Sequence, residues 1–162
     1  MPFWSGWASH KFKKPGVRYE IGIAIHSADI VWVNGPFPAG KFADITIFRR
    51  ELKQLLELER EQAEADDGYR GEPLTIELPN EGCYFGGEKQ KKLKKKVRSR
   101  HETVNGRLKE FGCLDQIFRH KRNRHKLCFD AVVVLTQIAI KTGEINVFSV
   151  KNYKTQTLYQ RM

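Results

Sequence analysis

Two adjacent carboxylates stand first among the residues that could carry chemistry. Asp66 and Asp67 are followed by Gly68 and Tyr69. Such a group suits a divalent cation, because hard cations prefer oxygen ligands and a flexible backbone lets the ligands approach. On composition alone, an ordinary acidic turn is the stronger interpretation, since aspartates commonly bond to their own backbone in turns.

A third carboxylate, Glu102, is the single acidic residue between Lys89 and Lys109. At about 100° per residue it shares a helix face with Lys95, Arg98 and Lys109. One interpretation is a surface ion pair between Arg98 and Glu102, which contributes a few tenths of a kcal/mol. The other is a carboxylate beside a phosphate-binding face, where it could ligate a cation.

Basic residues gather in two clusters around one predicted helix. The segment Lys89–Arg100 holds eight Lys or Arg and no acid, and Arg119–Lys126 holds five more. The whole chain has 29 Lys plus Arg against 19 Asp plus Glu, a net charge of +10. Solvated surfaces explain many single charge runs, but two clusters favour a polyanion such as the phosphate backbone of DNA. The residues expected to contact DNA are Lys92, Lys95, Arg98, Lys109, Arg119, Arg122 and Arg124.

Other chemistries find weaker support. A zinc site could be drawn through Cys113, His120, His125 and Cys128, but no Cys-x-x-Cys pair exists. The three cysteines form no disulfide framework, which favours a reducing compartment. The start of the chain has no signal-peptide core, and the aliphatic run Ala131–Leu135 is far too short to span a bilayer. We expect a protein inside the cell that does not bind membranes.

The elements that would position these residues begin with two strands. Apolar residues alternate with others over 17–26, which predicts a half-buried strand. A second apolar strand follows at Ile30–Val33, and Asn34–Pro36 is expected to end it. The short connection between the two strands predicts an antiparallel hairpin.

Three helices are expected after the hairpin. The first runs to about Gln62 with Asp44 as its N-cap, the second covers 88–111 and stops at Gly112, and the third covers 126–142 and stops at Gly143. A short strand and turn are predicted at 63–69 and mostly loop at 73–87. The third helix is apolar nearly all round, which predicts that it is buried. Mixed strands and helices indicate an α/β or α+β domain.

Four segments in this order resemble the DDE superfamily endonuclease domain of Harbinger-type transposases. They are SHKFKKPGVRYEIGIAI, DIVWVNGPFPAGKFADITIFR, EADDGYRG and RSRHETVNGRLKEFG. The resemblance covers about residues 3–142. It implies an α/β, ribonuclease H-like fold in which helices flank a mixed sheet, with the endonuclease domain over 1–145 and a C-terminal tail over 146–162.

The resemblance also implies a function. The family cleaves DNA phosphodiester bonds with Mg²⁺ or Mn²⁺ held by three carboxylates, one metal activating water and the other stabilising the leaving oxygen. Its motif Ala/Gly-Asp-x-Gly-Tyr matches Ala65–Tyr69 and selects Asp66 as catalytic and metal-binding, with Asp67 as the second choice of ligand. Its helix motif, with Arg four residues before Glu, selects Glu102. Asp44 matches an acid that the family carries after a Pro-x-Gly segment.

The family's first aspartate belongs to an Asp-Gly-Thr strand upstream of the segment that opens this chain, and neither Asp29 nor Asp44 takes its place. We therefore expect a ribonuclease H-like sheet that lacks its first central strand. Two functional hypotheses remain open. One is a transposase-derived nuclease from a transposable element, located in the nucleus and possibly assisted by a separate DNA-binding protein. The other is an inactive remnant that binds DNA or a protein partner.

Overall fold

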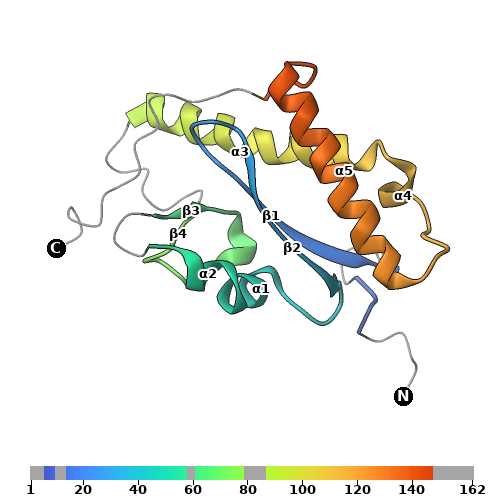
Figure 1. Cartoon of the computed structure of the whole chain (residues 1–162). Coiled ribbons are helices and arrows are strands. Elements are labelled where there is room, and N and C mark those ends of the chain that lie inside the picture. The colour runs from blue at the N-terminus through green and yellow to red at the C-terminus, as the bar shows by residue number, and fades with distance from the viewer. Residues whose placement is uncertain (1–5, 10–13, 58–60, 79–86, 148–162) are drawn as a thin grey trace. The chain divides into compact units, whose positions relative to one another are not determined.

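The computed structural model describes residues 6–9, 14–57, 61–78 and 87–147 of the chain (Figure 1). The protein is a mixed α/β molecule, and its described strands form two small sheets of two strands each. The chain divides into two compact units, with boundaries after Glu20, after Pro36 and after Lys94. Most of the expected tail, 146–162, lies outside the described residues, and the expected domain over 1–145 stays a prediction.

The first sheet is the hairpin of β1 (Val17–Ile23) and β2 (Ile30–Pro38). The alternation in the sequence predicted the first strand, and the apolar run Ile30–Val33 predicted the second. In the connection between them, the N–H of Ala24 donates to the carbonyl of Asp29 at 2.8 Å. The expected end of the second strand at 34–36 is wrong, because β2 continues through those residues. In a two-stranded sheet β2 is an edge, so a proline without an N–H leaves no central ladder bond unmade.

The first unit is built around a small core of Phe48, Ile76 and Leu78. Phe48 lies on α1 (Asp44–Arg50), which is followed by α2 (Leu52–Leu55). The predicted helix to Gln62 is therefore wrong. The backbone breaks at Glu51, with φ −129° and ψ −76°, and turns extended at Leu56, which packs against this core. Burial of apolar side chains here overrides local helix propensity.

The predicted helix cap is also corrected. The residue before α1 is Ala43, whose backbone is extended, and no side chain caps the helix. Asp44 is instead the first helical residue, and its Oδ1 accepts from Arg18 Nη1 at 2.9 Å. Its carboxylate therefore points toward β1 rather than toward its own helix.

A parallel pair of short strands completes the first unit. β3 (Ala63–Glu64) lies beside β4 (Ile76–Glu77), with Ala63 opposite Ile76 and Glu64 opposite Glu77. The strand at 63–64 and the following turn agree with the prediction, and the turn is the 3₁₀ helix η1 (Asp67–Tyr69). β4 falls where mostly loop was expected, and 79–86 lie outside the described residues.

The second unit contains most of α3 (Gly87–Lys109), together with α4 (Gly112–Asp115) and α5 (Arg122–Thr142). Val104 and Leu108 of α3 pack against Val132 of α5 in its core. Gly112 does not stop α3 as expected; α3 ends at Lys109 and Gly112 opens α4. Gly143 ends α5 in the left-handed conformation, φ 81°, as predicted.

Helix α5 differs from its prediction at both its start and its surface. It begins at Arg122, four residues before the expected start at Lys126. The expectation that it is buried all round is wrong, because one face of the helix is open to solvent. The exposed apolar residues on it are Leu127, Val134, Leu135 and Ile138.

Candidate functional site

The acidic turn that the sequence singled out is a short 3₁₀ turn in the first unit. Asp66 is the residue before η1, and its Oδ1 accepts from the N–H of Gly68 at 2.9 Å. Asp67 turns away and pairs with Arg70 Nη2 at 2.9 Å, with most of both side chains exposed. The two adjacent aspartates thus face different surroundings, and Asp66 is the one directed toward Gly68.

A second carboxylate, from Asp44, closes on the same glycine. A Cβ placed on Gly68 would lie 2.9 Å from Asp66 Oδ1 and 3.3 Å from Asp44 Oδ2. The missing side chain of Gly68 therefore leaves the space in which the two carboxylates approach. The signal for Asp44 as a site residue was weak, since it came only from the position of Asp44 after a Pro-x-Gly segment.

The electrostatics of this pair favour an added positive charge. Burial raises the pKa of the Asp44 carboxyl, the charge of Arg18 lowers it, and the charge of Asp66 raises it again. Two carboxylates that repel each other in partly buried surroundings are stabilised by a cation between them. Arg18 already supplies one positive charge to Asp44, through a contact of its Nη1 with Asp44 Oδ1 at 2.9 Å.

The negative charge of this pair also affects Tyr69, whose hydroxyl pKa it raises. Burial raises the pKa of its hydroxyl well above the ordinary value, and the charges of Glu20, Asp44 and Asp66 raise it further. The ring stacks edge-on against Phe48, with ring centroids 6.0 Å apart. Tyr69 therefore stays protonated, and its hydroxyl remains available as a hydrogen-bond donor.

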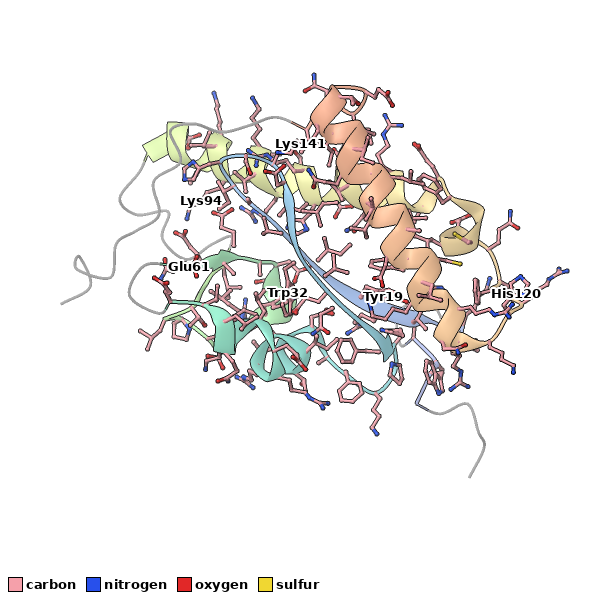
Figure 2. All side chains as sticks on the ribbon, viewed as in Figure 1. Tyr19, Trp32, Glu61, Lys94, His120 and Lys141 are labelled. Carbon is pink, nitrogen blue, oxygen red and sulfur yellow. The ribbon has the colours of Figure 1, made fainter. Side chains whose placement is uncertain are left out.

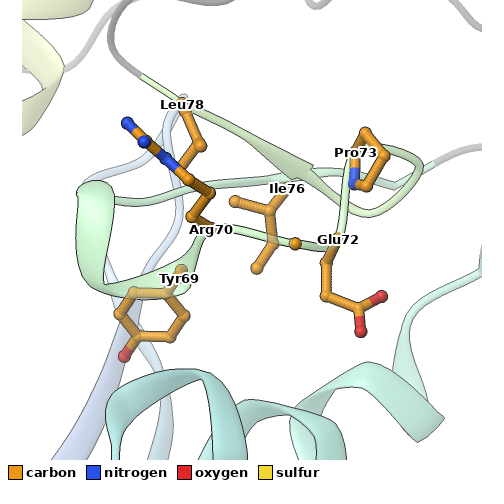
Figure 3. A pocket seen from close by; sticks show the side chains of 7 residues that line it. Tyr69, Arg70, Glu72, Pro73, Ile76 and Leu78 are labelled. Carbon is orange, nitrogen blue, oxygen red and sulfur yellow. The ribbon is translucent and has the colours of Figure 1, made fainter.

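A small cavity of about 220 Å³ adjoins the turn (Figure 3). Tyr69, Ile76 and Leu78 give it apolar walls, and Arg70 and Glu72 lie at its polar side. Glu72 is held there by Arg49 Nε at 2.6 Å and by Lys53 Nζ at 2.7 Å. The two ion pairs tie Glu72 to α1 and α2, and Ile76 of the same cavity lies in β4, which pairs with β3.

Glu102, the other predicted ligand, lies in the second unit, whereas Asp66 and Asp67 lie in the first. It is exposed on α3. Within the described part of the chain, no ion pair joins it to Arg98, so the alternative of a surface pair is not formed. The metal role of Glu102 stays a prediction.

Over 6–9, 14–57, 61–78 and 87–147, no three His, Cys, Asp or Glu side chains are arranged to hold a metal ion. Of the residues in the zinc alternative, His120 and His125 flank the ring of Phe118 at centroid distances of 5.5 and 4.8 Å. The Asp44–Asp66 pair offers two carboxylates, and a cation bound there would take its remaining ligands from water or from phosphate oxygens.

The predicted DNA-contacting residues are open to solvent. All are exposed except Arg98, which is half-buried; the set comprises Lys92, Lys95, Arg98, Lys109, Arg119, Arg122 and Arg124. Six of the seven side chains are therefore open to a phosphate group, and Arg98 is open in part.

Two other basic residues of the same run point inward, which the charge count did not anticipate. Lys94 (labelled in Figure 2) is buried and forms an ion pair with the buried Glu77 of β4. Arg100 is also buried and donates from Nη1 to the carbonyl of Ile25 at 2.6 Å. The signal was present in the spacing, because Lys94 precedes the buried Val97 by three residues and so lies on the same side of α3.

No family model matches the chain, and no curated protein or solved structure is significantly similar to it. Among the described residues, no helix combines the length and the apolar character needed to cross a membrane.

Proposed function

We propose that this chain is a DDE-type endonuclease domain that cleaves DNA with the help of Mg²⁺ or Mn²⁺. The observation that carries the proposal is the approach of Asp44 and Asp66 to one glycine in the turn that matches the family motif. Oxygen ligands of this kind hold hard divalent cations. Asp66 acts as a metal ligand in the proposed site, and Asp44 shares the cation with it. The family resemblance adds Glu102 of α3 to the proposed catalytic carboxylates.

When bound, the metal would activate water and stabilise charge on the phosphate. The chain's own residues have separate tasks. Asp66 and Asp44 would hold the cation, and the Gly68 backbone N–H donates to Asp66 Oδ1 and restrains its side chain. The exposed Lys and Arg residues of α3 and α5 position the DNA backbone without reading its sequence. A ribonuclease H-like fold, DNA as partner and a nuclear location belong to the same proposal.

The alternative is a DNA-binding protein that does not cut. Its support is the exposure of the predicted phosphate-contacting side chains, Lys92, Lys95 and Lys109 among them. The two functions differ in their need for a metal. Lysine side chains bind the DNA backbone without a divalent cation, whereas the nuclease requires one.

Metal binding by the chain tests the proposal directly. Titration of the full chain with Mn²⁺ in a calorimeter is expected to show a site whose affinity drops about tenfold or more in Asp66→Asn. Asp44→Asn is expected to weaken it as well. Asp67→Asn is the matched control, because Asp67 is paired with Arg70 and exposed. If Asp66→Asn bound Mn²⁺ as tightly as the unmodified chain, the assignment of the site would be wrong.

Cleavage is tested in a fusion that adds an Asp-Gly-Thr strand, which the family resemblance implies, before the chain. Nicking of plasmid DNA should require Mg²⁺ or Mn²⁺ and should be lost in Asp66→Ala and in Glu102→Ala. Activity that survived both substitutions would remove the nuclease assignment and leave the DNA-binding alternative.

A further inference from the structure

The loop that joins α4 to α5 presents one apolar side chain to solvent (orange in Figure 1). Ile117 is 88 % exposed, the largest fraction among the large apolar side chains that the structure describes. Phe118 is half-buried and Arg119 is exposed, and the backbone is extended at both ends of the loop, at Gln116 and at Lys121. Successive side chains of an extended segment point to opposite sides. Ile117 and Arg119 therefore face solvent on the same side, and Phe118 points inward.

The ring of Phe118 anchors the backbone that carries Ile117. Its centroid lies 5.5 Å from that of His120 and 4.8 Å from that of His125 (Figure 2). Burial lowers the pKa of the His125 imidazole, so this ring is neutral at pH 7 and packs as an aromatic group. His125 belongs to α5, so the loop is attached to a long helix. Ile117 consequently stands on a backbone that is held in place from behind.

Positive charge surrounds this side chain and exceeds the negative charge nearby. Residues 115–126 hold five Lys or Arg and one acid, the exposed Asp115. Lys126 is paired with Asp130 at 2.7 Å and is not counted here. The cations that are exposed and form no ion pair within the described part of the chain are Arg119, Lys121 and Arg124. Asp115 can offset one of these three, so the loop keeps a net positive charge.

A single apolar side chain among cations matches duplex DNA better than a protein surface. A stable protein interface buries about 800 Å² on each partner, with an apolar centre made by several residues, and this loop offers one. The phosphates of DNA neutralise cations, and one aliphatic side chain is enough to enter between two stacked base pairs from the minor groove. That groove is about 6 Å wide, so it admits an extended segment, whereas an α-helix needs the major groove.

We propose that Ile117 enters a base step of duplex DNA from the minor groove and partly unstacks it. Arg119 lies in the groove beside it, and Lys121 and Arg124 contact phosphates on the flanks. A wedge of this kind kinks the duplex by about 20–90° toward the major groove, so the loop bends DNA where the chain binds. The inference rests on DNA as the partner in the proposed function, but it needs neither the metal nor cleavage.

Unstacking is measured with a duplex that carries 2-aminopurine at a TpA step, because pyrimidine–purine steps unstack most easily. The full chain is added in the presence of EDTA. Binding is expected to raise the 2-aminopurine fluorescence, and Ile117→Ala should remove most of this rise. The slope of log affinity against log salt should stay the same in Ile117→Ala, because no charge is removed, whereas Arg119→Gln should reduce it by about 0.9.

Two further variants separate the wedge from a general loss of an apolar side chain. Leu74→Ala is the matched control, because Leu74 is 64 % exposed but lies in the first unit; the fluorescence rise should be unchanged. Ile117→Met keeps a long apolar side chain and should retain the rise. Far-ultraviolet circular dichroism of each variant establishes that the helices are retained.

The outcomes distinguish this inference from the proposed function. Binding without a fluorescence rise, or a rise that Ile117→Ala leaves intact, would overturn the wedge and leave DNA binding in place. No binding of the duplex by the folded chain would overturn the wedge and the choice of DNA as partner together. A rise that depends on Ile117, in a chain that binds no Mn²⁺, would support the wedge and contradict only the nuclease. A dimer in sedimentation that Ile117→Ala dissociates would assign this side chain to a second copy and overturn the proposal.

Discussion

At the scale of single residues, the acidic site depends on Gly68, which has no side chain. Gly68 leaves room for carboxylate oxygens from Asp66 and Asp44, which arrive from a turn and from the first residue of a helix. The same space would be filled by any other residue. The glycine therefore matters for the approach of the ligands rather than for an unusual backbone angle.

Replacing Gly68 by alanine tests this role. The new Cβ would meet Asp66 Oδ1 at 2.9 Å and Asp44 Oδ2 at 3.3 Å, so the carboxylates must separate. We expect Mn²⁺ affinity to fall about tenfold, by calorimetry, with a small change in melting temperature because both contacts are ends of flexible side chains.

Gly106→Ala is the matched control. Nothing lies within 4 Å of a Cβ there, and the residue is inside α3. It should stabilise the fold by about 1 kcal/mol and leave Mn²⁺ binding unchanged. Unchanged affinity in Gly68→Ala would show that the two carboxylates do not share a cation.

At the scale of elements, α3 divides its charges between two sides. Lys92 and Lys95 face solvent, whereas Lys94 is buried against Glu77 of β4. The pair fixes the first turns of α3 to the parallel sheet of the first unit. A buried ion pair is costly to desolvate, so this pair adds little net stability over two apolar side chains of similar size.

Removing one partner of this pair should destabilise the first unit strongly. Lys94→Met leaves the Glu77 carboxylate buried and uncompensated, which costs about 3–5 kcal/mol. Urea denaturation of the chain measures it. The double variant Lys94→Met with Glu77→Leu is expected to recover most of the loss, because no charge is then left in the interior. A double variant as unstable as the single one would contradict this account.

The sequence predicted elements well where the pattern was local. Alternating apolar residues predicted β1, a helix predicted over 88–111 agrees closely with α3, and Gly143 was correctly predicted to end α5. The prediction failed where contacts with distant residues determine the local structure. Leu56 is not helical and packs against a core that contains Ile76, and the buried position of Lys94 depends on its ion pair with Glu77. Neither partner is visible from a local window.

The candidate site shows the same division. The acidic turn and the solvent-facing lysines followed from residue type and spacing alone. The role of Asp44 did not, because a first-turn aspartate ordinarily caps its own helix. Its salt bridge with Arg18 and its approach to Gly68 are tertiary contacts, across 26 and 24 residues of chain.

At the scale of the whole molecule, the net charge of +10 would attract DNA before any specific contact forms. Each phosphate contact made by a lysine or arginine releases a condensed counterion, so affinity falls with salt in proportion to the number of contacts. Side chains that are buried contribute nothing to that number. The structure thus separates Lys92, Lys95 and Arg98, which reach solvent, from Lys94 and Arg100, which do not.

The salt dependence of DNA binding tests this separation. Changing Lys92, Lys95 and Arg98 together to glutamine should reduce the slope of log affinity against log salt by about 2.7, since each contact contributes about 0.9. The matched control changes three exposed cations of the first unit, Lys41, Arg50 and Arg70, and should reduce the slope by less than about 1. Fluorescence anisotropy of a labelled duplex over a series of KCl concentrations gives both slopes. An equal reduction of the slope in the two variants would mean that DNA responds to the net charge of the molecule and does not contact the outer side of α3 in particular.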